Sequence, residues 1–541
     1  MELRDSIISI FPAEEDIPAQ FRLAKPVEQN EYLVHGEIRR WDGPMEEAYS
    51  PVHVKTPSGL SPKLIGRYPL FTEKESLEAV HAAVCAYNNG RAPWPTMSVA
   101  ERIEHVQEFA RQMKTARSEV VNLLMWEIGK SCQDSEKEFD RTIDYIRGTI
   151  DALKDLDRVS SRFVISQGVI GQIRRAPMGV VLCMGPSNYP LNETFTTFIP
   201  ALIMGNTVIL KPPRPGTLLH YPLLQAMRDS FPKGVVNTVY GQGRVVAPPI
   251  MASGQINVLA FIGSSGAADS LKKQHPKPHR LRCVLGLEAK NAAIVLSDAD
   301  LDLTVKECLL GTLSYNGQRC TALKILFVHS DIVDSFLERF TAALRNVKCG
   351  MPWEQDVNIT PLPDMNQVKR QRALIDDALA NGAQVINEAG GTENHSFLYP
   401  AVLYPVNAQM KIYGEEQWGP VIPVLPFDCV ETPIQYLLNC NYGQQVSIFG
   451  SDADTIAELI DPLVNQVCRV NINSQCQRGP DILPFTGRKD SAEGTLSVSD
   501  ALRVFSIRTL VAAKDSDLNK GIITRIVRER KSSFLSTDFI L

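Results

Sequence analysis

Residues 179–210 read GVVLCMGPSNYPLNETFTTFIPALIMGNTVIL. A short apolar run, Gly179–Met184, is followed by a turn, by a helical stretch that begins near Leu191, and by a second apolar run, Thr207–Leu210. Strands that alternate with helices in this way are typical of a parallel sheet with helices on both faces. Such sheets bind ligands at the carboxyl ends of their strands.

The alternation continues along the chain. Further strands are expected at 235–239, 258–262, 292–296, 323–328 and 421–425. The stretch 162–176 alternates polar and apolar residues around two glycines, which predicts a hairpin apart from the main core, and 505–514 is expected to form a late strand. Between residues 76 and 156 the pattern is helical, and six apolar residues share one helix face: Phe139, Ile143, Ile146, Ile150, Leu153 and Leu156.

The composition is that of an ordinary globular protein. Of the 541 residues, 44% are hydrophobic and 22% are charged, and because one core rarely exceeds about 250–300 residues we expect at least two domains. The net charge of -5 gives no reason to propose nucleic acid as a partner. No apolar run approaches the roughly 20 residues that cross a bilayer, so no membrane partner is expected. The first residues lack the cationic start and apolar core of a secretory signal, so a cytoplasmic location is expected.

The cysteines and the two ends of the chain carry weaker signals. Eleven cysteines with no CxxC pair argue against a disulfide framework or a zinc cluster, and no metal is expected. The first sixty residues are rich in proline and charge, which predicts an extension that wraps a neighbour or is partly disordered. Residues 515–541 are expected to form a surface tail.

The sharpest local feature is the stretch 315–321, Tyr-Asn-Gly-Gln-Arg-Cys-Thr. Its Asn-Gly step predicts a tight turn, and Cys320 follows an arginine whose charge would favour the thiolate. Thiolates are good nucleophiles toward a carbonyl carbon. Taken alone, Cys320 would be read as a buried structural cysteine, but it is not isolated.

Four further motifs accompany it. They are Gly-Pro-Ser-Asn-Tyr-Pro-Leu (185–191), Gly-Asn-Thr-Val-Ile-Leu-Lys-Pro-Pro (205–213), Phe-Ile-Gly-Ser-Ser-Gly (261–266) and Glu-Glu-Gln-Trp-Gly-Pro (415–420). In this order, with Gly-Gln-Arg-Cys, they resemble the aldehyde dehydrogenase superfamily over about residues 75–514. The resemblance implies an α/β fold with a Rossmann-like dinucleotide domain, an α/β catalytic domain and a small β oligomerisation arm.

The resemblance also implies roles in the chemistry. Cys320 would form a thiohemiacetal with an aldehyde, and hydride transfer to a nicotinamide would leave a thioester that water hydrolyses. The side chain of Asn188 and the backbone N–H of Cys320 would form the oxyanion hole, in which one donor is worth roughly 3–4 kcal/mol.

The expected cofactor is NADP, with NAD as the alternative. Lys211 and Glu416 match the residues that hold the two riboses in the family, and Trp418 stands where the family usually has Phe beside the nicotinamide. Gly263 and Ser264 match the turn that meets the pyrophosphate near a helix N-terminus, and Gly241 is also assigned to cofactor binding.

Arg214 is the residue that favours NADP. It occupies a position at which relatives that use NAD often carry a Glu, and it could pair with a 2′-phosphate. The alternative is a solvated surface arginine.

Within the superfamily the chain is most similar to the non-phosphorylating glyceraldehyde-3-phosphate dehydrogenases. Those enzymes hold the substrate phosphate with three arginines and a tyrosine, and the matching residues are Arg141, Arg319, Arg478 and Tyr189. Arginine suits a dianion because of its forked donors. The resemblance thus implies oxidation of a phosphorylated aldehyde, glyceraldehyde-3-phosphate, to 3-phosphoglycerate without inorganic phosphate.

Three alternatives stay open. The substrate could be another acidic aldehyde such as a semialdehyde, which needs fewer cations, or the acyl group could pass to coenzyme A. An alternative of another class is a catalytically silent subunit that binds the dinucleotide.

One position departs from the family pattern. The usual general base is the Glu of Glu-Leu-Gly-Gly-Lys, and anchoring on Lys290 places Gly286 there. Glu288 follows two residues later, and on an extended segment that shift keeps the same face, so Glu288 could serve as the base. Alternatively Glu288 pairs with Lys290 or with an arginine.

The expected division of the chain is as follows. Residues 61–158 and 177–287 form the dinucleotide-binding domain and 288–494 form the catalytic domain. Residues 159–176 and 495–514 form the arm, and 1–60 and 515–541 are the terminal extensions. The resemblance implies a homodimer or homotetramer, because the arm has no core of its own.

Overall fold

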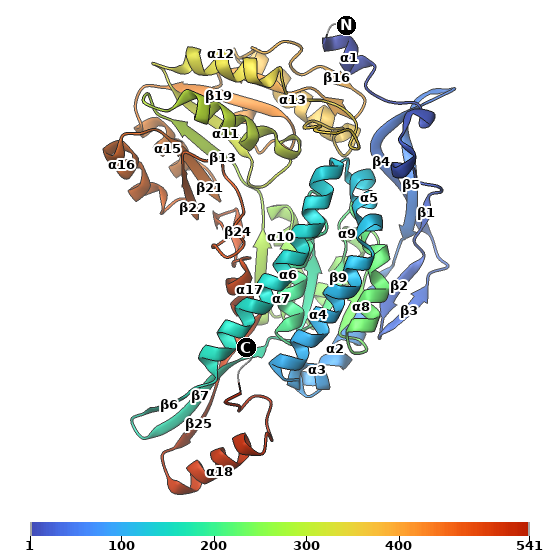
Figure 1. Ribbon diagram of the computed structural model, residues 1–541, viewed down its shortest axis with the longest axis vertical. Coiled ribbons are helices and arrows are strands. Elements are labelled where there is room, and N and C mark those ends of the chain that lie inside the picture. The colour runs from blue at the N-terminus through green and yellow to red at the C-terminus, as the bar shows by residue number, and fades with distance from the viewer. Residues whose placement is uncertain (1–2, 539–541) are drawn as a thin grey trace.

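The computed structural model describes residues 3–538, so residues 1–2 of the expected extension and 539–541 of the expected tail lie outside the described part. Two α/β units lie one above the other in Figure 1, and a thin β arm extends below them. This is the predicted α/β fold with a separate arm. No helix within residues 3–538 combines the length and the apolar character that crossing a membrane requires.

The first unit is built on a six-stranded sheet in the order β10-β9-β8-β11-β12-β24. Five strands are parallel, and only β24 is antiparallel. The strands are β8 (Val180–Met184), β9 (Thr207–Lys211), β10 (Val236–Thr238), β11 (Val258–Ile262), β12 (Arg282–Gly286) and β24 (Ala492–Glu493). Every residue of β8 and β9 is buried, which explains why both read as continuous apolar runs.

The order of these strands locates a binding crevice. From β8 the chain moves through β9 to β10 on one side, and then returns to β11 and β12 on the other side of β8. The order therefore reverses between β8 and β11, and ligands of open α/β sheets bind at such a switch point. The connecting helices are α7 (Asn192–Ile203), α8 (Leu224–Ser230), α9 (Gly243–Ala252) and α10 (Ser265–Gln274).

The second unit is built on a seven-stranded sheet in the order β15-β18-β19-β14-β13-β21-β22. Its strands are β13 (Asn291–Val295), β14 (Leu323–His329), β15 (Gln384–Val385), β18 (Ala401–Tyr404), β19 (Val421–Phe427), β21 (Gln445–Phe449) and β22 (Arg469–Ile472). All but the antiparallel edge strand β15 are parallel. The main helices of this unit are α11 (Leu301–Leu313), α12 (Val333–Leu344), α13 (Met365–Ala380), α15 (Glu431–Asn439) and α16 (Ala453–Leu463).

The helical region before the first sheet contains four long helices. They are α2 (Glu73–Tyr87), α4 (Val99–Thr115), α5 (Arg117–Ile128) and α6 (Cys132–Ser160). The helix face predicted from apolar spacing lies on α6, where Phe139, Ile143, Ile146, Ile150 and Leu153 are buried.

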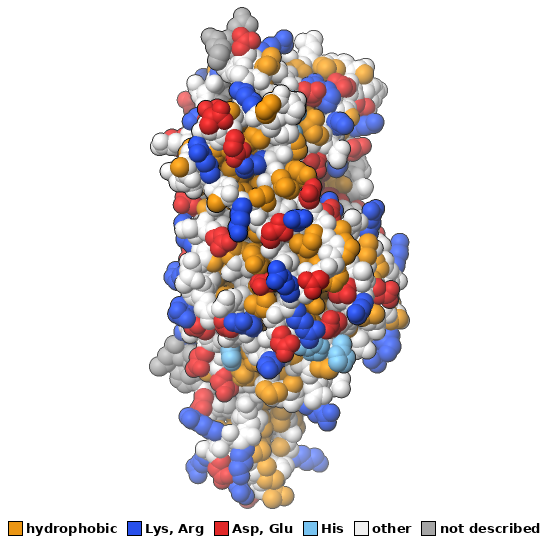
Figure 2. All heavy atoms as spheres, turned by 90° about the vertical axis from the view of Figure 1, so that its right-hand side faces the viewer, with side chains coloured by type: hydrophobic (Ala, Val, Ile, Leu, Met, Phe, Trp, Pro, Cys, Tyr) orange, Lys and Arg blue, Asp and Glu red, His pale blue; other side chains and the backbone are white. Residues whose placement is uncertain are grey.

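The N-terminal sixty residues correct an expectation. Instead of lacking order, they form α1 (Leu3–Ile8), β2 (Glu31–Val34), β3 (Glu37–Arg40) and the long hairpin β4 (Met45–Thr56) and β5 (Gly59–Pro69). These strands run along the right-hand side of Figure 1, and acidic and basic side chains are interspersed on the face they form in Figure 2. Since the hairpin crosses residue 60, we propose a boundary near residue 70 instead.

The first residues are held by the second unit. The side chains of Ile7 and Phe11 are each 1% exposed. The Asn394 amide donates to the carbonyls of Ile7 at 3.1 Å and Ile8 at 3.0 Å. Apolar burial and backbone pairing therefore replace the disorder that the composition suggested.

The arm is a three-stranded antiparallel sheet made of β6 (Phe163–Ser166), β7 (Val169–Pro177) and β25 (Ser506–Lys514). Several of its apolar side chains are exposed, and Figure 2 shows hydrophobic side chains on this narrow lower part of the molecule. They are Val164, Ile165, Val169, Ile507, Leu510 and Val511.

The C-terminal residues are only partly the surface tail that was expected. Helix α18 (Asp517–Arg528) has no buried residue. The segment after it folds back on the arm, where Gln172 donates to the Ser536 carbonyl at 2.6 Å and Arg174 to the Phe534 carbonyl at 3.3 Å. Leu535 is buried there.

Candidate active site

A cavity of about 1000 Å³ lies between the two units. Twelve of the thirteen other predicted site residues line it together with Cys320, drawn from the strand ends of both sheets. Its size is that of a large ligand site. The exception is Gly241, which stands outside the lining; its φ of 105° and the 3.0 Å from an added Cβ to the Phe71 nitrogen give it a local structural reason to be glycine.

Cys320 follows the tight turn that its sequence predicts. Tyr315, Asn316 and Gly317 have φ values of 49°, 57° and 71°, so the chain turns through three successive left-handed residues. Buried partners hold this turn: the Thr360 N–H donates to Asn316 Oδ1 at 3.0 Å, and Lys324 Nζ donates to the Gly317 carbonyl at 2.7 Å. The loop therefore presents Cys320 to the cavity in a fixed position.

The protonation of Cys320 differs from the sequence-based expectation. Burial in the cavity and then the negative charge of Glu193 raise the pKa of the Cys320 thiol to about 11. The Arg319 guanidinium does not act on the sulfur as expected, because its Nη2 turns to the Gly311 carbonyl at 3.2 Å and to Gln475 Oε1 at 3.3 Å. Near neutral pH the thiol is therefore protonated, and a base has to take its proton before attack.

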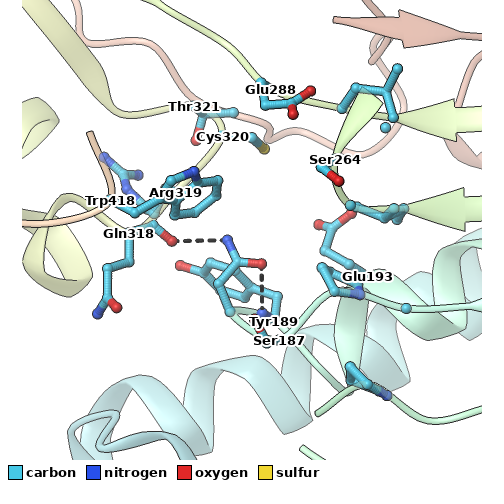
Figure 3. Close-up of a pocket in the computed structure, with 18 of the residues that line it drawn as sticks. Ser187, Tyr189, Glu193, Ser264, Glu288, Gln318, Arg319, Cys320, Thr321 and Trp418 are labelled. Carbon is cyan, nitrogen blue, oxygen red and sulfur yellow. Dashed lines mark hydrogen bonds between the residues drawn. The ribbon is translucent and has the colours of Figure 1, made fainter. Parts of the chain in front are cut away.

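Asn188 stands in the loop between β8 and α7, in direct contact with the Cys320 loop. Its side-chain amide donates to the Gln318 carbonyl at 2.8 Å, two residues before the cysteine (Figure 3). Its Oδ1 accepts from the Tyr189 N–H at 3.1 Å, and its own carbonyl accepts from Lys130 Nζ at 2.9 Å. An amide donor thus lies close to the nucleophile, as stabilisation of an oxyanion requires.

Two buried charged residues that were predicted to bind the riboses have few partners, and the ion pair that Glu416 forms with Lys324 is long, at 3.7 Å. Both carboxylate oxygens of Glu416 are buried with no hydrogen-bond partner in residues 3–538, and burial raises the pKa of Glu416 to about 7. Burial and the charge of Arg214 lower the pKa of Lys211 to about 8, and its Nζ donates only to the adjacent Pro212 carbonyl at 3.0 Å. Ribose hydroxyls, which both donate and accept, would satisfy both groups, so these residues fit a dinucleotide.

Helix α10 begins at the cavity wall. Ser264 is its N-cap, with the hydroxyl accepting from the Ala267 N–H at 3.4 Å, and Gly263 lies beside it in the lining. Backbone N–H groups at a helix start favour an anion. In this structure the anion is Glu288, which accepts from the Ser265 N–H at 2.9 Å and 3.1 Å.

Glu288 lies near the nucleophile, but its hydrogen-bond partner is one that the sequence did not suggest. It lines the cavity, but the pairing with Lys290 is absent, because Lys290 Nζ donates to the Glu415 carbonyl and to Gln417 Oε1, both at 2.7 Å. β12 ends at Gly286, so residue 288 lies beyond the strand and the strand itself does not fix the direction of the Glu288 side chain. Figure 3 shows Glu288 near both Cys320 and Ser264, so the rotamer of the Glu288 side chain decides which of the two residues it approaches.

The three arginines and Tyr189 line the same cavity, but carboxylates already pair with two of them. Arg141 donates to Asp481 at 2.8 Å and 3.2 Å. Arg478 donates to the same Asp481 at 3.3 Å and also forms an ion pair with Glu193. Although burial alone would raise it, the hydrogen bonds and charges of the two arginines hold the pKa of Asp481 below its usual range.

Arg319 stands apart from this network. Both of its hydrogen-bond partners are neutral, and within the described chain its Nε is buried without a partner. The local sum of three arginines, Asp481 and Glu193 is one positive charge rather than three.

Sequence reasoning missed both carboxylates. Asp481 lies three residues after Arg478, and Glu193 lies in the first turn of α7, five residues after Asn188. The closeness in sequence of each acidic residue to a proposed site residue was the signal that could have predicted these ion pairs.

Comparisons with known proteins agree with this geometry. The sequence pattern of the aldehyde dehydrogenase family matches residues 45–510. An NADP-dependent glyceraldehyde-3-phosphate dehydrogenase of Streptococcus equinus is 32% identical over 457 residues, which is 84% of this chain and 92% of the relative. A lactaldehyde dehydrogenase of Methanococcus aeolicus is 26% identical over 85% of this chain and 97% of its own.

A solved structure agrees as well. The NADP-dependent glyceraldehyde-3-phosphate dehydrogenase of Bacillus halodurans, complexed with NADP, has a TM-score of 0.82 and 29% identity, and the match covers 90% of this chain and 100% of that one. The family pattern covers both sheets, the Cys320 loop, β6, β7 and the first half of β25. The chain therefore belongs to the aldehyde dehydrogenase family.

Proposed function

We propose that this enzyme oxidises glyceraldehyde-3-phosphate to 3-phosphoglycerate, reduces NADP, and consumes no inorganic phosphate. The observation that carries the proposal is that Arg141, Arg319, Arg478 and Tyr189 line the cavity that also contains Cys320. The similarity to the streptococcal enzyme supports the same assignment.

The proposed chemistry begins at Cys320. Its sulfur attacks the carbonyl carbon and the thiol proton leaves to a base, which gives a thiohemiacetal whose oxyanion the Asn188 amide stabilises. The dinucleotide, when bound, supplies the acceptor for the hydride that leaves this carbon. Water then cleaves the thioester, so the overall balance is aldehyde, NADP and water in, and acid, NADPH and protons out.

The general base that activates water to hydrolyse the thioester is the one role that the family pattern leaves unassigned. Gly286 has no side chain to supply it, and we propose Glu288 as the carboxylate that does. Glu288 has to leave the Ser265 N–H to reach the thioester, and an anion arriving at the start of α10 would displace it from there.

A second substrate class is favoured by one observation. Because Asp481 and Glu193 neutralise two of the three arginines, this group of five side chains carries one net positive charge, which suits a monoanion better than a phosphate dianion. An aldehyde with a single carboxylate, such as succinic semialdehyde, is therefore the second candidate.

One assay tests the proposal. Purified protein is mixed with glyceraldehyde-3-phosphate and NADP in phosphate-free buffer, and NADPH is followed by absorbance over many turnovers. Steady production that Cys320→Ser abolishes supports the proposal. A burst of one equivalent of NADPH that then stops would indicate that coenzyme A, and not water, accepts the acyl group. No NADPH with this aldehyde, together with turnover of succinic semialdehyde, would select the second candidate.

We also propose that the arm joins subunits into a homodimer or homotetramer. Its edge strands β6 and β25 carry exposed apolar side chains that a monomer would leave in water. Light scattering on Leu510→Lys against the unchanged chain tests this, because a charge on the arm should lower the molecular mass if the arm is the interface.

A further inference from the structure

At the far end of the cavity, an acidic side chain from the N-terminal hairpin meets the arginine that favours NADP. Glu46, on β4, forms an ion pair with Arg214, whose side chain lines the cavity and is half exposed. Glu46 itself is 17% exposed and stands behind the lining. The charges of Arg214 and Glu46 both reach Lys211, so the three groups lie together.

The pair leaves polar atoms unsatisfied. Glu46 and Tyr68 face one another across β4 and β5. The second carboxylate oxygen of Glu46 and the hydroxyl of Tyr68 are both buried without a hydrogen-bond partner in the described chain. Buried polar atoms without partners are rare in folded proteins, and here one of them belongs to the carboxylate directly behind Arg214, which lines the cavity.

Two opposite selectivity features therefore meet at one point. A carboxylate that accepts from the 2′-hydroxyl of adenosine is the usual sign of an NAD site, and an arginine that pairs with a 2′-phosphate is the sign of an NADP site. In this chain the two come from segments 168 positions apart and neutralise each other.

We propose that Glu46 competes with the cofactor's 2′-phosphate for Arg214 and thereby sets how strongly the enzyme prefers NADP over NAD. The inference rests on the proposed function only in requiring that a dinucleotide binds here. To bind NADP, Arg214 has to give up Glu46, and the carboxylate then lies beside a phosphate dianion. To bind NAD, the pair can stay closed, because a free 2′-hydroxyl brings no negative charge that competes with Glu46 for Arg214.

The test is the affinity of the full chain for both cofactors, measured by titration calorimetry without substrate. Glu46→Gln removes the competing charge and should raise the ratio of NADP to NAD affinity about tenfold, whereas Arg214→Gln should lower it by a similar factor. The matched control is Glu47→Gln, because Glu47 is the next residue on β4 and its carboxylate accepts from the Tyr49 hydroxyl at 2.5 Å instead.

The outcomes separate this inference from the proposed function. If both cofactors bind and neither Glu46→Gln nor Arg214→Gln moves the ratio more than Glu47→Gln does, the inference is wrong and the proposed function stands. If neither cofactor binds the unchanged chain, the proposed function itself fails. A thermal melting curve for each variant shows whether it is folded, and the opposite shifts expected of the two variants cannot come from a shared loss of structure.

Discussion

The ammonium group of Lys130 lies 3.5 Å from the centre of the Tyr189 ring, and its side chain has no exposure to solvent. It forms an ion pair with Glu138 and donates to the Asn188 carbonyl at 2.9 Å. The other oxygen of Glu138 accepts from the Leu191 and Asn192 N–H groups, at 3.0 Å and 3.1 Å. A buried ion pair thus fixes the loop that carries the proposed oxyanion and substrate residues.

Removing Lys130 should harm both stability and catalysis. Lys130→Met leaves Glu138 buried without its cation, and breaking a buried pair in this way costs about 3–5 kcal/mol. The double variant Lys130→Met with Glu138→Gln should recover much of the melting temperature but not kcat, because the Asn188 carbonyl still lacks its donor. Full recovery of kcat in the double variant would reduce Lys130 to a structural role.

The high pKa of Cys320 predicts how its reactivity depends on pH. With a pKa of about 11, the thiolate fraction of the ligand-free enzyme should grow about tenfold for each pH unit from 7 to 10. Alkylation by iodoacetamide, followed by mass spectrometry of the Cys320 peptide, should rise with the same slope.

Glu193→Gln sharpens that experiment. It removes a charge that raises the pKa, so Cys320 should be alkylated faster at a given pH. A plateau below pH 9 in the unchanged chain would contradict the raised pKa. No substrate protection of Cys320 would favour the silent-subunit alternative.

Glu288→Gln tests the base for the water step. If Glu288 is that base, the burst of NADPH should persist while steady turnover falls about 100-fold or more. An equal loss in burst and steady rate would indicate that Glu288 supports cofactor binding at α10 instead.

Gly286→Glu is the complementary gain-of-function variant. A Cβ at this position would meet the Ile262 side chain at 3.4 Å, an ordinary contact, so the site has room for a side chain. We expect steady turnover to rise relative to the burst, with Gly286→Gln as a control of similar size that cannot accept a proton at neutral pH. No difference between the two variants would show that hydrolysis is not limited by a base at this position.

Glu193 should also set the preference between anionic substrates. Glu193→Gln frees Arg478 for the substrate, so KM for glyceraldehyde-3-phosphate should fall about five- to tenfold. KM for propionaldehyde, which has no charge to recognise, serves as the control. An equal fall for both aldehydes would contradict a role in charge recognition.

The sequence predicted the elements whose burial is continuous. β8, β9, β11 and β14 are apolar because both faces of the sheets are covered, and that pattern is visible without a structure. The N-terminal hairpin escaped prediction because β4 mixes exposed acidic residues with a buried half, so its sequence shows neither a continuous apolar run nor a regular alternation.

The residues around the cavity were predicted by motif, but their ion pairs were not. Glu193 and Arg478 form an ion pair although they are 285 positions apart in the sequence, and no local pattern predicts such a pair. Glu288 was expected near the nucleophile and lies there, but its hydrogen bond to the Ser265 N–H at the start of α10 was not predicted. The partner that a charged side chain in a cavity binds depends on distances and on solvation, and both are set only by the folded structure.

The contact between the first residues and Asn394 has a consequence for synthesis of the protein. Ile7 and Asn394 are 387 positions apart, so the ribosome adds nearly four hundred residues before this contact can form. At a translation rate of about 5–20 residues per second, the apolar side chains of Ile7 and Phe11 stay unburied for on the order of 20 to 80 s before the segment that packs on them has been synthesised. During that interval the nascent chain exposes these apolar side chains, and binding by a chaperone there would lower the chance of aggregation before the second unit emerges.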